Sequence, residues 1–219
     1  MTAATMTPAA YPVRFSVDYP DRPLNRLTSA LRIFAAVPIL FVLLWVSGSG
    51  LVWSGGGQNA AAGAGGVLFL GPLLMILFRR KYPRWWFDWN VELQRFTSRV
   101  VVYLALMDDH YPSTDEQQAV HLDYDYPDAG RELNRWAPLV KWLLAIPHFI
   151  ALLFLWIAAF AVVVSAWFAI LFTGRYPRRM FKFLEGVLRW DQRVIAYALV
   201  LTTDRYPPFS LSAAAASDR

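Results

Sequence analysis

The sequence contains one long apolar run, from Trp142 to Gly174, that holds no Asp, Glu, Lys or Arg. Eighteen of its residues are Leu, Ile, Val or Phe. At about −0.4 kcal/mol for each such side chain, their transfer into a bilayer is favoured by about 7 kcal/mol. A continuous run of this length is typical of a membrane-spanning segment and exceeds what the core of a soluble protein needs.

The length of this run constrains its shape. A single straight helix over it would be about 50 Å long, whereas the hydrocarbon core of a bilayer is about 30 Å thick. The run therefore predicts a hairpin of two short spans, with one steeply tilted helix as the alternative. A second uncharged region, Ile33 to Phe78, is split by the Gly/Ser/Ala-rich stretch Ser47 to Gly66 and predicts another hairpin with a flexible outer loop.

Five short motifs occur twice, in the same order, which predicts two tandem copies of one unit. Pro38 and Pro147 are 109 positions apart, but Tyr82 and Tyr176 are only 94 apart, so the first copy carries 15 extra residues. Placing these residues in the Gly-rich stretch leaves a reversal at Trp156–Phe160 in the second copy. The paired motifs are Asp18-Tyr19-Pro20 with Asp125-Tyr126-Pro127, Leu24-Asn25-Arg26 with Leu133-Asn134-Arg135, Val37-Pro38 with Ile146-Pro147, Lys81-Tyr82-Pro83-Arg84 with Arg175-Tyr176-Pro177-Arg178, and Asp109-His110-Tyr111-Pro112 with Asp204-Arg205-Tyr206-Pro207.

The predicted fold class is an all-α integral membrane protein with two tandem repeats, each a transmembrane helical hairpin plus an interfacial amphipathic helix. The predicted divisions are repeat one at 1–112 (hairpin about 30–78, amphipathic helix about 85–107), a linker at 113–120, repeat two at 121–209 (hairpin about 138–176, amphipathic helix about 180–201) and a flexible tail at 210–219.

Charge placement predicts the sidedness. The Lys and Arg residues lie outside the two uncharged regions, so the positive-inside rule places both termini and the middle segment in the cytoplasm of a multi-pass plasma-membrane protein. The net charge of +5 is explained in this way without nucleic acid. The expected partners are membrane lipids, with a membrane-protein partner or a second copy as further candidates. The chain has no Cys, which excludes disulfides and thiol catalysis, and its start lacks the pattern of a signal peptide.

An apolar stripe at three- and four-residue spacing follows each hairpin and indicates an amphipathic helix. Two arginines one turn apart recur beside each stripe, and tryptophans crowd the start of the first helix. The candidate lipid or partner contacts are therefore Arg95, Arg99, Arg189, Arg193, Trp85, Trp86, Trp89 and Trp190. The alternative is that each stripe packs on the hairpins while its arginines are solvated. Seven of the ten tyrosines precede a proline, and we expect these to anchor at the membrane interface.

No catalytic, metal or cofactor site is predicted. The histidines, His110, His121 and His148, lack metal-ligand spacing. An ionisable group inside a membrane is a functional candidate by default, but His148 lies near the interface, where a satisfied or snorkelling side chain is the favoured interpretation. The Gly-rich stretch has no phosphate-loop pattern, and the cluster at Asp108-Asp109-His110 reads as a solvated linker.

Three stretches resemble the domain of unknown function 4389 family of bacterial membrane proteins: Trp142-Leu-Leu-Ala-Ile-Pro-His148, Ala166-Trp-Phe-Ala-Ile-Leu-Phe-Thr-Gly-Arg-Tyr-Pro-Arg178 and Ala196-Tyr-Ala-Leu-Val-Leu-Thr-Thr-Asp-Arg-Tyr-Pro-Pro-Phe209. Copy one departs from the pattern, because Ile39 replaces the histidine and no glycine stands beside Lys81. The resemblance implies a bacterial inner-membrane protein with two tandem copies and no assigned activity.

The functional expectation is a non-enzymatic, membrane-organising or accessory subunit that presents a basic, aromatic cytoplasmic collar. The alternative is a component of a transporter or channel for a lipid or a small neutral solute. A polar cavity between the copies would favour transport, whereas a solid interface would favour the accessory function.

Overall fold

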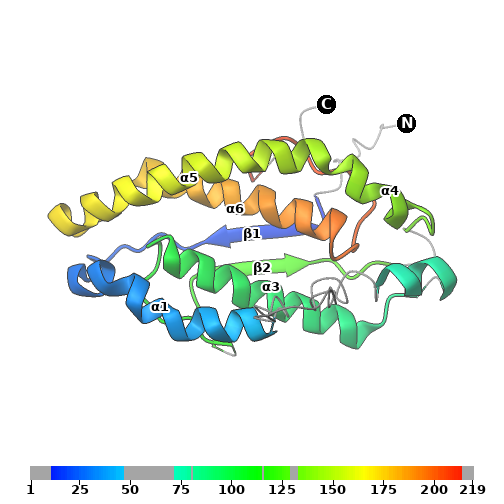
Figure 1. The fold of residues 1–219 in the computed structure, drawn as a ribbon, viewed down its shortest axis with the longest axis horizontal. Coiled ribbons are helices and arrows are strands. Elements are labelled where there is room, and N and C mark those ends of the chain that lie inside the picture. Colours follow the sequence, from blue (N-terminus) through cyan, green and yellow to red (C-terminus); the bar gives the residue numbers. More distant parts are fainter. Residues whose placement is uncertain (1–10, 47–71, 80, 115, 129–132, 214–219) are drawn as a thin grey trace, which may run out of the picture.

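The computed structural model describes residues 11–46, 72–79, 81–114, 116–128 and 133–213. In chain order the elements are β1 (Val13–Val17), α1 (Arg26–Val46), the short π-helix η1 (Met75–Arg79), α3 (Arg84–Leu104), β2 (Val120–Tyr124), α4 (Ala137–Leu144), α5 (Ile146–Thr173) and α6 (Arg178–Ala198). Figure 1 shows the helices running along the long axis of the molecule, with the two strands at its centre. The predicted amphipathic helices are present as α3 and α6.

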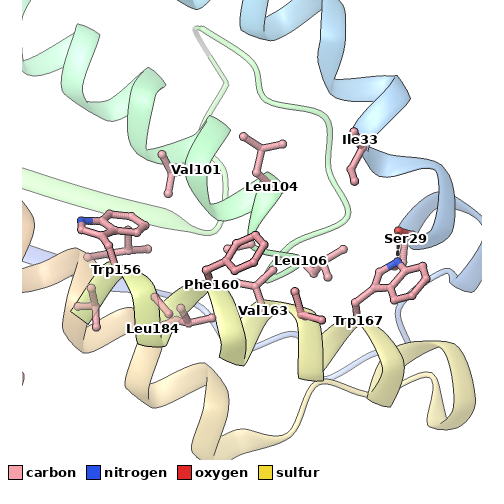
Figure 2. A pocket seen from close by; sticks show the side chains of 15 residues that line it. Ser29, Ile33, Val101, Leu104, Leu106, Trp156, Phe160, Val163, Trp167 and Leu184 are labelled. Atoms are coloured by element: carbon pink, nitrogen blue, oxygen red, sulfur yellow. Dashed lines mark hydrogen bonds between the residues drawn. The ribbon is translucent and has the colours of Figure 1, made fainter. Parts of the chain in front are cut away.

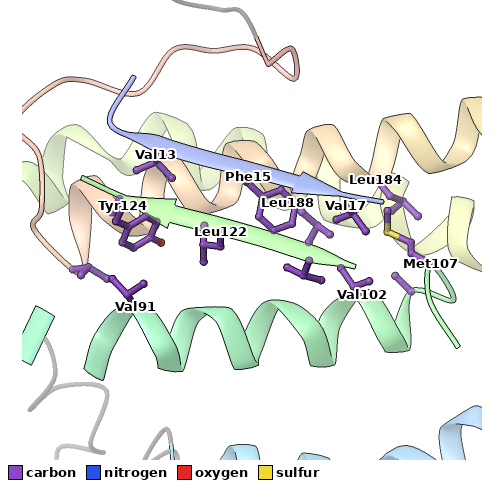
Figure 3. Packing of buried hydrophobic residues seen from close by; sticks show 14 of the residues in the cluster. Val13, Phe15, Val17, Val91, Val102, Met107, Leu122, Tyr124, Leu184 and Leu188 are labelled. Atoms are coloured by element: carbon purple, nitrogen blue, oxygen red, sulfur yellow. The ribbon is translucent and has the colours of Figure 1, made fainter. Parts of the chain in front are cut away.

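Helices α3 and α6 form a middle layer. Val91 and Val102 of α3 pack toward the strands (Figure 3), whereas Phe96 and Val100, on the opposite side of α3, pack against α1. Helix α6 contacts β1 in the same way and packs against α5. The strands therefore lie on one face of the α3–α6 layer, and α1 and α5 lie on the other.

The two-stranded antiparallel sheet corrects the prediction of an all-α fold. Each strand alternates buried and exposed side chains, and its buried face covers the middle layer. The alternation of apolar and polar residues in Val13–Val17 and Val120–Tyr124 is the period-two pattern of a half-buried strand. With only five residues in each segment, the pattern is too short to predict a strand from the sequence. The second strand begins at the last residue of the predicted linker.

The predicted hairpin in the second repeat is wrong. Helix α5 continues through Trp156–Phe160 without reversing, so Lys141 and Arg175 stand at opposite ends of the α4–α5 rod. The segment Trp156–Phe160 contains no Gly, Pro or Asn to form a turn, and α6 packs alongside α5 as its antiparallel neighbour. The segment forms one continuous helix, as the alternative had it; the steep tilt of that helix across a bilayer stays a prediction. The reversal predicted in the first repeat falls on 47–71, outside the described residues.

Tyrosines of the Tyr-Pro motifs join the two halves through matching hydrogen bonds. The Tyr19 hydroxyl donates to the carbonyl oxygen of Tyr176, and the Tyr126 hydroxyl donates to that of Tyr82. Tyr82 and Tyr176 in turn donate across the molecule, to the carbonyl oxygens of Val200 and Ala105. Both of these rings are buried, so they are core residues and not the interfacial anchors that the sequence predicted.

Candidate functional site

The four predicted contact arginines point toward the chain's own backbone. Arg189 Nε donates to the carbonyl oxygen of Phe15 at 2.9 Å, and Arg95 Nε donates to that of Leu122 at 2.8 Å. Arg99 Nη1 donates to the carbonyl oxygen of Ser113 at 2.7 Å, and Arg193 bonds the carbonyl oxygens of residues 210 and 212. Arg99, Arg189 and Arg193 are buried. This geometry gives the arginines a role in packing, and their predicted contact with lipid stays a prediction.

The four predicted tryptophans separate into two groups. Trp85 and Trp89 are exposed near the start of α3, and their rings flank Trp86. Trp190 is buried, and its indole nitrogen donates to Nδ1 of His148 at 3.1 Å. Only the group on α3 is placed where a lipid headgroup or a partner could reach it.

His148 is enclosed by aromatic rings. Its ring stacks on Phe209 with centroids 4.0 Å apart and meets Trp190 edge-on. Because Nδ1 accepts the hydrogen bond from Trp190, the neutral ring carries its proton on Nε2. His148 is fully buried, so it does not extend toward the interface. Its Nδ1 is satisfied by Trp190, whereas its Nε2 has no hydrogen-bond partner among the described residues, so the interpretation of a satisfied side chain is only partly correct.

Two buried cations, which the sequence analysis did not single out, occupy corresponding positions in the two halves. Arg32 pairs with Asp109 and donates to the carbonyl oxygen of Tyr103 at 2.8 Å. Lys141 pairs with Asp204 at 2.6 Å and donates to the carbonyl oxygen of residue 203. Burial lowers the pKa of Lys141, and the hydrogen bond that its ammonium group donates to the Asp204 carboxylate opposes that shift. These ion pairs fasten α1 and α4 to the chain that follows α3 and α6.

An apolar pocket of about 610 Å³ lies where α1, α3, α5 and α6 meet (Figure 2). Its volume falls within the range of about 300–1,000 Å³ found for small-molecule sites. Ile33 and Phe160 at the rim are exposed. The buried floor is formed by Ala105, Leu106, Leu184, Val187 and Leu188. The pocket is therefore lined by both halves of the chain and opens on the side formed by α1 and α5.

Ser29 is the polar side chain in the lining of this pocket. It is buried, and its hydroxyl has no hydrogen-bond partner among the described residues. Its carbonyl oxygen accepts a hydrogen bond of 3.2 Å from the indole of Trp167, the dashed line in Figure 2. Leaving a buried hydroxyl unpaired costs free energy, so Ser29 offers a hydrogen bond to any ligand in the pocket.

Asp191 is a carboxyl group held in a buried environment. Burial raises its pKa to about 6, while a hydrogen bond with the Trp156 side chain opposes the shift. Asp191 belongs to α6 and Trp156 to α5, so the carboxyl group lies between these helices. Within the part of the chain that the structure describes, no group of three His, Asp or Glu side chains could hold a metal ion.

The pocket could not be predicted from the sequence, because its lining comes from four helices in both halves of the chain. The sequence signal nearest to the pocket is the apolar stripe on α3 and on α6. Each stripe predicts that one face of its helix is buried, but it does not identify the segment that packs against that face. The sequence led us to expect either a polar cavity between the copies, which would favour transport, or a solid interface, which would favour the accessory function. The structure shows a third case, because the cavity is apolar.

Comparison with known protein families finds a match for one part of the chain. None of the curated proteins and none of the solved structures matches it. Residues 135–210 match the family model described as a domain of unknown function, DUF4389. The match runs from just before α4 to just after α6, so it contains Lys141, His148 and the α5 and α6 walls of the pocket. It covers one of the two predicted copies, and the DUF4389 description attaches no activity to these residues.

Proposed function

We propose that this chain is a non-enzymatic membrane protein that lies in the plane of the bilayer, with α1 and α5 immersed in the hydrocarbon of one leaflet. The observation that supports this proposal is the difference in polarity between the two outer faces of the molecule. Large apolar side chains of α1 and α5 are exposed, including Phe34, Ile157 and Phe160. On the far side of the middle layer, the outward side chains of the strands include Arg14 and Asp123, each of which forms an ion pair.

The exposed apolar residues are too many for a surface that faces water. They recur along nearly all of both helices, and extended apolar surfaces of this kind mark membrane or protein contacts. Helices α1 and α5 are each long and apolar enough to cross a membrane. The exposed apolar side chains are Leu27, Leu31, Ile33, Phe34, Val37, Phe41 and Val42 on α1, and Ile146, Phe149, Ile150, Leu153, Phe154, Trp156, Ile157, Phe160, Val164, Phe168 and Phe172 on α5.

The packing of α5 argues for an in-plane orientation over a spanning one. Helix α5 packs against α6, and α6 packs against β1, so a perpendicular α5 would carry these elements into the hydrocarbon. The ion pairs Arg14–Asp125 and Arg95–Asp123 would then lie in the membrane. Each Arg or Asp at the centre of a bilayer costs about 2.5–3.5 kcal/mol. An in-plane chain keeps these charges in water, as interfacial amphipathic proteins do.

The water-facing side would be the cytoplasm. In this orientation the strands and the charged ends of α3 and α6 lie together on that side, and the anionic lipids of the cytoplasmic leaflet attract basic residues. Exposed Trp85 and Trp89 would lie at the level of the headgroups. This arrangement keeps the cytoplasmic termini and the aromatic collar of the sequence analysis, in a bacterial plasma membrane, and replaces the multi-pass topology with a single embedded layer.

Membrane depth along α5 tests the proposal. Single cysteines at exposed Ile150, Ile157 and Phe172 would carry spin labels in reconstituted vesicles, and accessibility to oxygen and to a water-soluble nickel reagent gives each depth. We expect similar depths within one leaflet for all three positions, with Ser16→Cys on the outward face of β1 as the aqueous control. A maximum at Ile157 with shallow positions on either side would show a spanning helix and overturn the in-plane proposal.

A lipid-handling function is the second candidate, because the pocket is apolar and opens toward the side proposed to face acyl chains. Lipid movement between leaflets distinguishes the two functions. Vesicles containing the protein and a fluorescent phospholipid analogue should show the same reduction by external dithionite as protein-free vesicles if the protein is an accessory subunit. Faster loss of the inner-leaflet signal would favour transport.

A further inference from the structure

We propose that the pocket between α1 and α5 holds one acyl chain of a membrane phospholipid, with the polar end of that lipid at Ser29. This inference rests on the proposed function, because the acyl chain must reach the pocket from the hydrocarbon around α1 and α5. It adds a specific binding site to what would otherwise be a general apolar surface.

The lining of the pocket determines the class of ligand. Apart from Ser29, the lining side chains are aliphatic or aromatic, and the floor at Ala105, Leu106 and Leu188 is buried. A floor of this kind offers no hydrogen bonds to a polar solute, whereas it gains dispersion contacts from a hydrocarbon chain. Rim residues Ile33 and Phe160 also belong to the exposed apolar surface, so the pocket is continuous with the layer proposed to contact lipid.

Ser29 determines the orientation of the lipid. Its buried, unpartnered hydroxyl can donate to an ester carbonyl oxygen, which is the first polar group beyond the acyl chain of a phospholipid. Ser29 lies in the first turn of α1, and exposed Arg26 one turn earlier has its guanidinium group beside Gly174 at the end of α5. A cation at this end of the pocket suits the phosphate group of the same lipid.

Photo-crosslinking in vesicles tests the site. The full chain would be reconstituted in phosphatidylglycerol and phosphatidylethanolamine that include a phospholipid with a diazirine on its acyl chain, and adducts would be mapped by mass spectrometry. We expect adducts at the buried floor, at Leu106 and Leu188, as well as on the exposed face at Phe154 and Ile157. Bulk lipid reaches the face alone, so labelling of the face without the floor would overturn the pocket assignment. Absence of labelling at both places would instead refute the membrane proposal.

Two pairs of variants sharpen the test. Val163→Trp should fill the pocket and abolish floor adducts while face adducts persist, and Ile157→Trp on the exposed face is the matched control. Ser29→Ala should reduce floor adducts roughly two- to ten-fold, as expected for one lost hydrogen bond. Its control is Ser165→Ala, whose hydroxyl already bonds the carbonyl oxygen of Ala161. Floor labelling that is unchanged in both Val163→Trp and Ser29→Ala would overturn the proposal.

Discussion

Phe15 and Leu122 lie directly opposite each other in the antiparallel ladder of β1 and β2. Each stands three residues before an Asp-Tyr-Pro motif, so a residue of the first half pairs with its own counterpart in the second. The backbone carbonyls of the same two residues accept hydrogen bonds from Arg189 and Arg95. The strand of each half thus contacts the helix of the other, and neither half contains a complete core.

Truncating either member of this pair should therefore unfold both halves together. Phe15→Ala is expected to lower the free energy of unfolding by about 3–5 kcal/mol and Leu122→Ala by about 2–5 kcal/mol, because both side chains are buried. Urea unfolding in mild detergent, followed by tryptophan fluorescence, measures the loss. Ser16→Ala on the outward face of β1 is the control and should change stability by less than about 0.5 kcal/mol. Equal effects for the three variants would contradict the central role of the sheet.

Removing the charge of Arg189 should destabilise the fold. Its guanidinium group is buried, pairs with Glu185 and bonds the carbonyl oxygens of Phe15 and Leu211. Arg189→Gln leaves these partners unsatisfied, with an expected loss of about 3–5 kcal/mol in the free energy of unfolding.

The matched control for this loss is Arg178→Gln at the start of the same helix. Arg178 pairs with Asp21 at 3.9 Å, and both side chains are largely exposed. A loss below about 1 kcal/mol is expected there. If Arg189→Gln instead weakened retention of anionic lipid in native mass spectra without any change in stability, the original assignment of a lipid contact would be favoured.

Asp191 should make stability depend on pH. Burial raises its pKa from 3.8 to about 6, so the folded protein binds this proton more tightly than the unfolded chain. Stability contributed by this group is therefore lost as the pH rises from about 4 to about 6. Asp191→Asn cannot ionise and should be more stable than the native chain by about 3 kcal/mol at pH 7.

At pH 4 the native chain and the Asp191→Asn variant should differ little, because Asp191 is then largely protonated in the folded protein. Unfolding curves at both pH values test this difference, with exposed Asp18→Asn measured in parallel. A stabilisation by Asp191→Asn that is equal at pH 4 and pH 7 would show that the carboxyl group is not the cause.

The continuity of α5 can be measured as a distance. The native chain has no cysteine, so Val140→Cys and Arg175→Cys would introduce the only thiols, both at exposed positions. At 1.5 Å per residue the 35 positions between the labels would span about 52 Å on one straight helix. Because α4 and α5 are separate helices, the labels should stand somewhat closer than this but far beyond the spacing of packed neighbours, a distance that pulsed electron paramagnetic resonance can resolve. A reversal near Ala158 would bring the labels to the same end, at about the 10 Å spacing of packed helices.

Sequence reasoning located the amphipathic helices well because their signal is local. The apolar stripes containing Phe96 and Val194 repeat at helical spacing over many turns, so α3 and α6 lie close to the predicted ranges. The Tyr-Pro motifs recur in order along the sequence, and a duplication of the unit stays a prediction. The corresponding tyrosines then make corresponding hydrogen bonds between the halves.

The sequence alone determined which segments are apolar, which are amphipathic and which residues correspond between the halves. Tertiary structure decided the rest. The hydropathy of a segment reflects the free energy of its transfer from water to an apolar environment, but it does not report the direction in which the chain runs. It therefore could not distinguish a reversal at Trp156–Phe160 from the continuous helix that packs against α6. The five-residue strands gain stability only when Phe15 meets Leu122 across more than a hundred residues of chain. Arg95 and Arg189 gain their partners only in the folded protein, because the backbone carbonyls that they bond belong to the other half of the chain. The pocket likewise exists only because four separate helices converge on one apolar space.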